Sequence, residues 1–486
     1  MILLCLAAIW LAGFGLVRWM FPRPLGWSLH NVLLLSLAIG TGAGIASCVY
    51  FLALLLAGPN VTVLASALGA AVVCALALGL LTKRRGTQFD SAEGPPVPGY
   101  LIAFFVLAAA LAVIMFLGTV AYTPHGEEGA WSIWNLRARF LVRSGPFWRT
   151  AFSRDLAWTH PDYPLLLPGL VALCWKLAAQ ESTAAPIAIA FLFALGTAGV
   201  LTSTLAVLRG KTQALIAGTL LLGSASFIAL SAALYGDVPL SFYILSSLAL
   251  LCLQDRHPED LRFSVLAGLL AGFAAWTRNE GVIFVVALLI GRAFALFRWR
   301  ERAAIVPQFL RLLAGLAAPI AVVVIFKLRV APPGELISMP ASTILKNLAD
   351  PGRWITTLEG LVFVLISFGR FLIPIVLLLA LYAYLVRLKV DSRDRASLAT
   401  AVIALPLTLA TQLLVDILSV PYLPLEITTS FERFLLQLWP AALLIFFLAS
   451  GPLELLAPAA ARKGKVPARA AKPKAARSPR SVAETR

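Results

Sequence analysis

The chain has 486 residues, of which 60% are hydrophobic and 13% are charged. A soluble domain carries about 25% charged residues, so this composition excludes a soluble globular protein and predicts an all-α polytopic membrane protein. The net charge of +17 would suit nucleic-acid binding, but residues 462–486 alone hold nine Lys or Arg against one Glu. We therefore expect no nucleic-acid partner, and we predict that residues 451–486 form a basic, disordered cytoplasmic tail beside anionic lipid.

A membrane-spanning helix needs about 20 mainly apolar residues, and about thirteen or fourteen such helices are predicted. The apolar runs fall near residues 1–21, 29–57, 60–82, 98–121, 162–179, 184–208, 213–233, 238–254, 263–277, 281–297, 309–330, 356–387, 397–418 and 434–450. The first run has no positive n-region and no cleavage site, so we expect it to be retained. Residues 1–97 are predicted to form N-terminal helices with a cytoplasmic loop, and residues 98–450 a transmembrane core.

The Lys and Arg residues of the short loops predict the orientation. Basic loops are assigned to the cytoplasm: Arg18 and Arg23, 83–85, 209–211, 255–262, 298–302 and 386–395. The remaining loops then lie outside: 121–161, 235–240, 277–281, 331–355 and 420–433. The stretch 162–208 must cross an odd number of times although it contains two apolar runs. One of the two runs is therefore short, re-entrant or interfacial.

The loop 121–161 is predicted to carry an interfacial helix. Five residues recur there at helical spacing: Trp131, Trp134, Asn135, Ala138 and Leu141. Arginines such as Arg137 lie largely off this stripe, which is typical of a helix lying flat at headgroup level. Glu127 and Glu128 immediately precede the helix. They either stabilise its positive end or carry chemistry, because acids gain nothing from anionic headgroups.

Five polar clusters share the predicted outer face. They are Glu127 with Glu128, the HPDYP segment 160–164, Tyr235 with Asp237, Arg278 with Glu280, and Glu432 with Arg433. Each cluster alone has a structural explanation, such as a helix cap, a turn ion pair or a headgroup anchor. Their gathering on one face favours a site, because acids can act as bases and arginines can bind phosphate.

The order of these motifs resembles a known family. A tryptophan-rich loop, HPDYPLLLP, YGDVPL, WTRNEG and FERFLLQLWP follow one another, as in bacterial polytopic GT-C glycosyltransferases. That superfamily includes the polyprenyl-phosphate-mannose protein mannosyltransferases and the aminoarabinose transferases of lipid A. The resemblance covers roughly residues 98–450. It implies a multi-pass enzyme of the bacterial inner membrane that takes a sugar from a polyprenyl-phosphate carrier on the outer face and inverts the anomeric centre.

The resemblance also suggests roles for individual residues. Such enzymes keep an acid in the first large outer loop, in a sequence close to G-x-D-A-W, whereas HGEEGAW has Gly129 at that place. The expected general base is therefore Glu128, with Glu127 second and Asp237 assisting. The expected substrate-binding residues are His160, Asp162, Tyr163, Tyr235, Arg278, Glu280, Arg433 and Arg137.

The expected partners are a polyprenyl-phosphate-linked sugar donor, membrane lipid and an acceptor that is a lipid, glycan or protein. The outer loop contains no D-x-D motif, so we expect no metal and no other cofactor. An alternative function is a transporter or flippase for a lipid-linked or anionic solute. The absence of an internal repeat and the position of the polar residues at helix ends favour the enzyme. A glycan polymerase or ligase using polyprenyl diphosphate donors is a third possibility.

Overall fold

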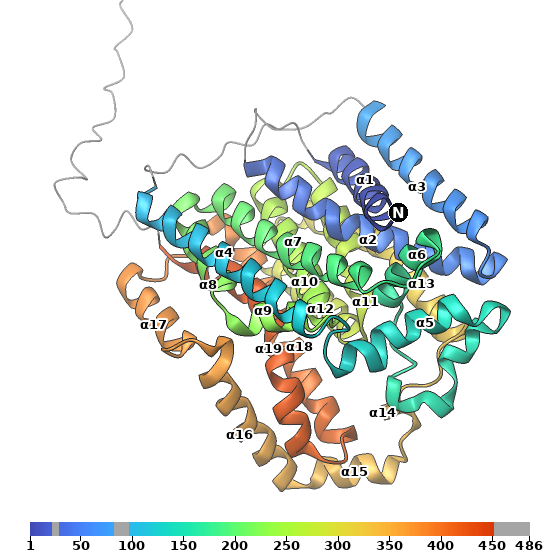
Figure 1. Ribbon diagram of the computed structural model, residues 1–486. Helices are drawn as coiled ribbons and strands as arrows, with labels where there is room; N and C mark the ends of the chain where they lie inside the picture. Colours follow the sequence, from blue (N-terminus) through green and yellow to red (C-terminus); the bar gives the residue numbers. More distant parts are fainter. Residues whose placement is uncertain (22–28, 82–96, 452–486) are drawn as a thin grey trace, which may run out of the picture.

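A computed structural model describes residues 1–21, 29–81 and 97–451 of the chain (Figure 1). The described residues form helices and one isolated bridge between Leu388 and Ser450. The predictions for Arg23, for the basic loop at 83–85 and for the tail beyond residue 451 lie outside the described residues. The composition-based expectation of a helical multi-pass membrane protein is confirmed by the many long apolar helices.

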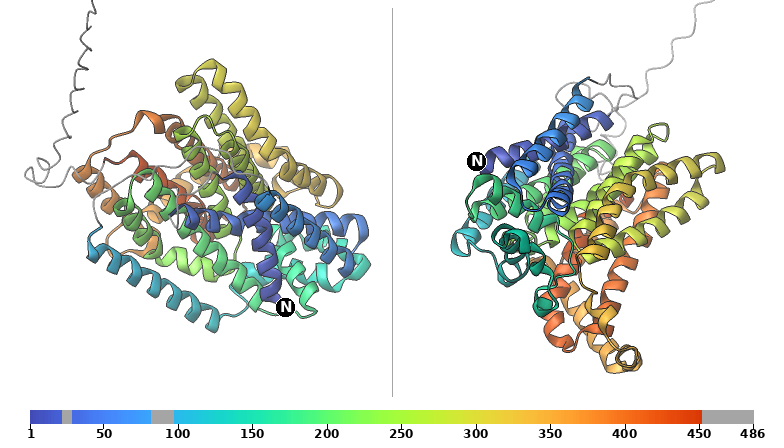
Figure 2. Two further views of the ribbon diagram at one scale, coloured as in Figure 1. Left: turned by 90° about the horizontal axis from the view of Figure 1, so that it is seen from above. Right: turned by 90° about the vertical axis from the view of Figure 1, so that its right-hand side faces the viewer.

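The N-terminal helices are α1 (Ile2–Met20), α2 (Leu29–Ala57), α3 (Val61–Leu81) and α4 (Gly99–Tyr122). A Cβ atom at Gly13 of α1 would collide with the backbone of α2, and one at Gly15 would collide with α3. These glycines therefore let the first three helices pack closely, as small residues do between membrane helices. In contrast, α4 runs along the edge of the molecule (Figure 2) and contacts α8 and α9.

Short helices connect α4 to the central bundle. They are η1 (Ala130–Trp134), α5 (Asn135–Arg143), η2 (Gly145–Phe152), η3 (Arg154–Thr159) and α6 (Leu166–Ala178). The end of α5 is joined to the chain just after α6, because Arg143 donates to both carboxylate oxygens of Glu181 at 2.8 and 2.6 Å. With 13 residues, α6 is about 20 Å long and does not reach across a hydrocarbon core of about 30 Å.

The central bundle is built around a buried helix. It contains α7 (Ala184–Leu208), α8 (Lys211–Leu222), α9 (Ala225–Ala232), α10 (Asp237–Arg256), α11 (Arg262–Thr277), α12 (Asn279–Trp299) and α13 (Arg302–Arg329). Every residue of α10 from Asp237 to Asp255 is buried. Between its charged ends the helix carries apolar residues on all sides with a few small polar ones among them, as expected for a helix enclosed by protein, and it packs against α7, α11 and α19.

The C-terminal part comprises α14 (Glu335–Ser338), α15 (Ala341–Ala349), α16 (Pro351–Ser367), η4 (Phe368–Arg370), α17 (Ile375–Val386), η5 (Ser392–Asp394), α18 (Arg395–Ser419) and α19 (Leu423–Ala449). Figure 1 shows α18 and α19 extending beyond the bundle, with α15 lying across their end. Asn347 of α15 donates to the main-chain oxygen of Leu418 at 2.8 Å, and Arg353 of α16 donates to those of Ile417 at 2.7 Å and Val420 at 2.6 Å, so both helices are bonded to the end of α18. Such donation satisfies carbonyl groups that a helix leaves unpaired at its C-terminus.

By length and composition alone, the described part of the chain contains fewer helices of spanning length than the thirteen or fourteen predicted. Among the described residues, eleven helices are long and apolar enough to cross a membrane, or twelve if α8 and α9, bent by 59°, form one span. The apolar runs at 162–179 and 263–277 form α6 and α11, which have only 13 and 16 residues. Nevertheless, α11 runs back along α10 from one end to the other, because Arg278 at its C-terminus bonds to Asp237 at the N-terminus of α10. Hydropathy alone does not show where within an apolar run the helix begins and ends, so residues of the neighbouring loops are counted as helix. Of the alternatives for 162–208, the structure shows a short helix followed by one helix of spanning length.

Buried charges gather at both ends of α10. At the C-terminal end, which we call the Asp394 end, Arg256 donates to both carboxylate oxygens of Asp394 at 2.6 Å. Arg209 lies 3.6 Å from the same carboxylate, and Arg292 of α12 pairs with Asp255 at 2.8 Å. The opposite end carries Asp237 and is called the Asp237 end. Because charged groups are costly to bury alone, these pairs fix the relative positions of α7, α10, α12 and α18.

We predict that Asp394→Asn lowers the free energy of unfolding by about 3–5 kcal/mol, because Arg256 and Arg209 lose the carboxylate that compensates them. Asp391→Asn is the matched control. The Asp391 side chain is 36% exposed and caps η5, and Asn caps as well as Asp, so the expected change is below about 1 kcal/mol. Denaturant titration in detergent measures both variants. Equal effects in the two variants would contradict a supporting role for the Asp394 network.

Candidate functional site

Asp237, the first residue of α10, is the centre of the second charged cluster. Its side chain is fully buried. Arg278 Nη1 donates to both carboxylate oxygens at 3.1 Å, Arg433 Nε donates to one at 3.2 Å and Gln437 Nε2 donates to the other at 2.7 Å. Four donated bonds from three side chains, two of them cationic, compensate the burial of this carboxylate. Residues from α10, α19 and the α11–α12 junction thereby meet at one point.

Arg278 is enclosed by protein on all sides. It joins α11 to α12, is 3% exposed, and donates to Glu280 Oε1 through Nε at 3.1 Å and also through Nη2. Its Cζ atom lies 5.7 Å from the centre of the Trp134 ring and 5.3 Å from that of Tyr163, within the range of cation–π attraction. A Cβ atom at Gly236 would lie 2.8 Å from the Trp134 ring, so a larger residue there would displace this ring.

Arg433 is held less completely than Arg278. Its side chain is 21% exposed, and within the described part of the chain its only hydrogen bond is the one from Nε to Asp237. The guanidinium lies 4.9 Å from the centre of the Tyr235 ring. Asp237 and Tyr235 therefore fix the orientation of Arg433, while its two terminal amino groups form no bond with the described residues. Its sequence neighbour Glu432 turns elsewhere, to Ser226 and to Arg370 at 3.3 Å.

The loop after α4 is docked beside Tyr235. The main-chain N–H of Gly129 donates to the Tyr235 hydroxyl at 3.3 Å, and that of Glu127 donates to the carbonyl of Ala233 at 3.3 Å. Gly126 has φ +75°, and a Cβ atom there would lie 2.6 Å from the Ala233 oxygen, so glycine permits the approach. Leu234 has φ +63°, a strained conformation of the kind that clusters at functional sites.

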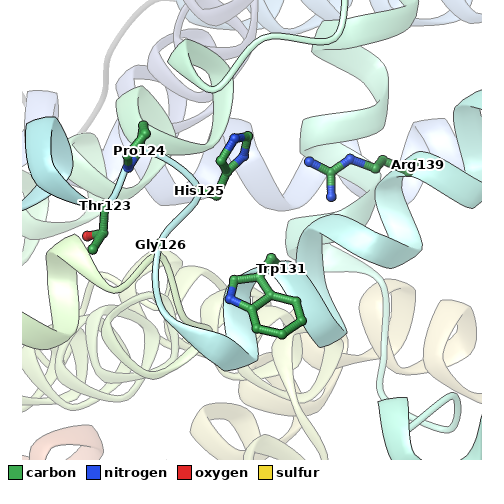
Figure 3. A pocket seen from close by; sticks show the side chains of 6 residues that line it. All are labelled: Thr123, Pro124, His125, Gly126, Trp131 and Arg139. Atoms are coloured by element: carbon green, nitrogen blue, oxygen red, sulfur yellow. The ribbon is translucent and has the colours of Figure 1, made fainter.

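Glu127 and Glu128 are exposed on this loop. Neither carboxylate forms a hydrogen bond or ion pair with another described residue. The main-chain bonds of Glu127 to Ala233 and of Gly129 to Tyr235 place this part of the loop beside the cluster. The same loop borders an open hollow of about 450 Å³ (Figure 3), lined by Thr123, Pro124, His125, Gly126, Trp131 and Arg139. Figure 3 shows His125, Trp131 and Arg139 around this space.

The HPDYP segment connects the loop region to α12 and α13. The His160 ring stacks on Tyr163 with the ring centres 4.8 Å apart. Asn279 Nδ2 donates to the Asp162 carboxylate at 2.6 Å, and Lys327 Nζ donates to the Asp162 carbonyl at 2.6 Å. Burial raises the pKa of Tyr163. His160, Asp162 and Tyr163 thus contact the cluster or its supporting residues.

Arg137 is buried, although the helical spacing placed it off the apolar stripe. Its Nη2 atom donates to the carbonyls of Thr159 and His160 at 2.7 Å, and Nη1 donates to that of Tyr163 at 3.4 Å. Burial lowers its pKa to about 10. Because the guanidinium is committed to these main-chain oxygens and is 2% exposed, Arg137 positions the HPDYP segment and does not face a ligand-accessible space.

Sequence reasoning missed four residues that support the cluster. They are Asn279, Lys327, Gln437 and Trp134, whose ring lies over Arg278. Gln437 was detectable in principle, because it lies one helical turn after Arg433 in an otherwise apolar run. Asn279 stands inside the TRNEG motif itself. Lys327 showed no signal beyond a cation at the end of an apolar helix, since its partner Asp162 is 165 residues away in the sequence.

Among the described residues, no group of three or more His, Cys, Asp or Glu side chains is arranged to hold a metal ion. No family model, curated protein or solved structure matches the chain significantly. The functional argument therefore starts from the Asp237 cluster and the loop that docks on it.

We predict that the stability of the protein falls as pH decreases below about 6.5, the ordinary pKa of histidine. Burial lowers the pKa of His160 in the folded protein, and the charge of Asp162 opposes this only in part. Below the ordinary pKa, His160 is protonated in the unfolded chain but stays neutral in the folded protein. The free energy of unfolding therefore decreases with falling pH until the lower pKa of His160 in the folded protein is reached. One such group contributes a slope of at most about 1.4 kcal/mol per pH unit.

His160→Asn is expected to reduce this slope, and asparagine tolerates the positive φ of 48° at this position. His125→Asn is the control, because His125 is exposed. The free energy of unfolding is measured between pH 7.5 and 5 for both variants. If His160→Asn leaves the slope of the free energy of unfolding against pH unchanged, other groups cause the pH dependence.

Proposed function

We propose that the protein is a GT-C-type glycosyltransferase that moves a sugar from a polyprenyl-phosphate donor to an acceptor hydroxyl on the outer face of a bacterial inner membrane. The observation that supports this most directly is the state of Arg433. Its guanidinium is oriented by Asp237 and Tyr235, and its terminal amino groups are not bonded to the described residues. Such a group, at the end of an apolar bundle and near unpaired carboxylates, suits a lipid phosphate that arrives laterally.

The two arginines of the cluster have different roles in this proposal. Arg433 binds the donor phosphate, while Arg278 is saturated by Asp237 and Glu280 and positions the Asp237 carboxylate. A phosphate leaving group needs stabilisation of its charge more than it needs a proton. An arginine held in place before the reaction supplies this stabilisation without rearrangement.

The acceptor is activated by a carboxylate of the loop docked on Tyr235. Glu128 takes the proton of the acceptor hydroxyl while the hydroxyl oxygen bonds to the anomeric carbon. The bond between that carbon and the phosphate oxygen breaks, and its electron pair leaves with the polyprenyl phosphate. Attack opposite the leaving group inverts the anomeric centre. Glu127, which is equally exposed, is the second candidate for the base.

The proposed orientation puts the Asp237 end outside the cytoplasm. Basic loops follow the helices that finish at the Asp394 end, including Arg209, Arg256 and Arg300. An excess of Lys and Arg in short loops is typical of the cytoplasmic side. The short helices α5 and α6 then lie on the outer side, because α6 begins beside the Asp237 cluster and α7 returns to Arg209.

A transporter is the second candidate, and one observation favours it. The bent pair of α8 and α9 leads directly to Tyr235, and broken helices often line the binding sites of transporters. The two functions differ in their products. Purified protein in detergent with radiolabelled polyprenyl-phosphate sugars and a crude envelope acceptor fraction forms a labelled product if it is a transferase. If no labelled product forms with any polyprenyl-monophosphate donor, the transferase proposal is refuted.

We predict that Glu128→Gln lowers turnover by about 10²–10⁴-fold, the usual effect of losing a general base. Donor binding remains nearly normal, because glutamine keeps the size of the side chain. Turnover and donor affinity are measured in the same preparation, together with Glu127→Gln. If both variants retain near-normal turnover, the loop glutamates take no part in the chemistry.

Arg433→Lys is expected to raise the donor KM and lower turnover, at least tenfold in kcat/KM, because an ammonium cannot reproduce the planar fork that binds phosphate. Arg370→Lys is the matched control, since Arg370 lies at the same end, is exposed, and its side chain forms one ion pair within the described part of the chain, with Glu432 at 3.3 Å. Steady-state transfer kinetics with a defined donor compare the two variants. Unchanged kinetics in Arg433→Lys would place the phosphate elsewhere.

A further inference from the structure

Two of the five cysteines meet in the fold, although 169 positions separate them in the sequence. The Sγ atom of Cys174 lies 3.5 Å from that of Cys5, and both thiols are free. Cys174 is fully buried and Cys5 is 6% exposed. The other cysteines, Cys48, Cys74 and Cys252, lie on three different helices. The proposed transfer chemistry does not use the contact between Cys5 and Cys174.

The two thiols need only a small rearrangement to form a disulfide. A disulfide holds its sulfur atoms about 2.05 Å apart, so these two must approach by roughly 1.5 Å from their separation of 3.5 Å. A change of side-chain rotamer moves a sulfur atom further than this. The helices that carry the thiols are already packed together, and Figure 1 shows the start of α1, marked N, beside α6. The pair is therefore positioned to be oxidised.

A bond between these thiols would join the N-terminal helices to the support of the candidate site. Cys5 lies in α1, which packs on α2 and α3, whereas Cys174 lies in α6. The HPDYP segment, which contacts the Asp237 cluster or its supporting residues, leads directly into α6. At the start of α6, Ser47 of α2 donates to the carbonyl of Leu165 at 3.1 Å. A disulfide at Cys174 would add a covalent link in the second half of the same short helix.

The orientation given above, which rests on the proposed function, puts the pair toward the outer side of the membrane. Arg18 lies in the last turn of α1 and marks its cytoplasmic end, while Cys5 lies near the opposite end of the same helix. In this orientation α6 also lies on the outer side. The space outside a bacterial inner membrane is oxidising, and disulfides form and persist there. The environment of the pair thus favours the disulfide over the two thiols.

We propose that Cys5 and Cys174 form a reversible disulfide that holds α6 against α1, with a disulfide compound outside the inner membrane as the oxidant. Cys5, the more exposed thiol, loses its proton, attacks the oxidant and releases one half of it as a thiol. Cys174 then loses its proton, attacks the Cys5 sulfur of the mixed disulfide and releases the second half. The oxidant thereby gains the two electrons and two protons that the cysteines lose. A thiol reductant reverses both steps by the same exchange.

Peptide mapping of the wild-type protein tests the proposal. The purified full-length protein in detergent is treated with dithiodipyridine, a small apolar disulfide, the remaining thiols are blocked, and the peptides are mapped by mass spectrometry without reduction. We expect the Cys5–Cys174 cross-linked peptide to be at least about tenfold more abundant than any other cysteine pair, because the contact gives the second thiol a high effective concentration. Dithiothreitol should remove it. If the exposed Cys74 is modified and no Cys5–Cys174 peptide forms, the proposal is wrong.

Oxidation should also raise the midpoint of thermal unfolding by about 2–5 °C, because a link between residues 169 positions apart restricts the unfolded chain. Cys5→Ala and Cys174→Ala should each abolish this shift. Cys48→Ala, which removes another buried cysteine, is the matched control and should keep it. Each variant is compared in its oxidised and reduced forms, so that any effect of the substitution itself cancels. An equal shift in all three variants would contradict the proposed pair.

Spheroplasts and inside-out vesicles test the outer placement. Oxidised glutathione does not cross membranes, so it should cross-link the pair in spheroplasts and not in inside-out vesicles. Cross-linking only in the vesicles would overturn the outer placement, and cross-linking in neither preparation would overturn the proposed oxidant. The cross-link is measured without sugar transfer. Its absence from a protein that transfers sugar would refute the disulfide alone, and its presence in a protein that transfers none would reject the transferase function alone.

Discussion

The burial of one carboxylate, that of Asp237, determines the arrangement of this end of the molecule. A charged carboxylate at the N-terminus of an enclosed helix is stable only if cations and hydrogen-bond donors surround it. Arg278, Arg433 and Gln437 provide them from two other places in the chain. Each of these donors then imposes its own requirement: Arg278 needs Glu280 and two aromatic rings, and Arg433 needs Tyr235. The docking of the first loop follows from the position of Tyr235.

The same compensation explains why the two arginines differ. Arg278 uses its donors inside the protein and is 3% exposed, so a change there would disturb the support of the site. Arg433 is bound through one nitrogen and keeps an accessible edge. A preorganised cation beside an apolar surface is the arrangement in which electrostatic stabilisation of a leaving phosphate is strongest, because little water competes for the anion.

Sequence patterns predicted the helices well because hydropathy reports burial in lipid or protein directly. They also predicted that Asp237, Arg278, Glu280 and Arg433 lie at one end, since loop charges and helix lengths determine which termini share an end. The patterns did not predict the partners within that end. Lys327 stands at the end of an apolar run with its partner Asp162 lying 165 positions away, and no periodicity indicates that such residues meet. Likewise, the length of α6 depends on where the HPDYP segment is tied down by Arg137, which hydropathy does not report.

The two ends of α10 use charge in different ways. At the Asp394 end the buried carboxylates of Asp394 and Asp255 each face at least two arginines, and the unpartnered Nε atoms of Arg209 and Arg300 are themselves buried. At the Asp237 end, the Oε2 atom of Glu280 and the terminal amino groups of Arg433 have no hydrogen-bond partner among the described residues. Evolution of a stable fold alone favours pairing these groups, because each unpaired group reduces stability. Arg433 differs from the arginines of the Asp394 end because its terminal amino groups form no bond with the described residues while its side chain is 21% exposed, so a ligand can complete the bonding that the fold leaves open.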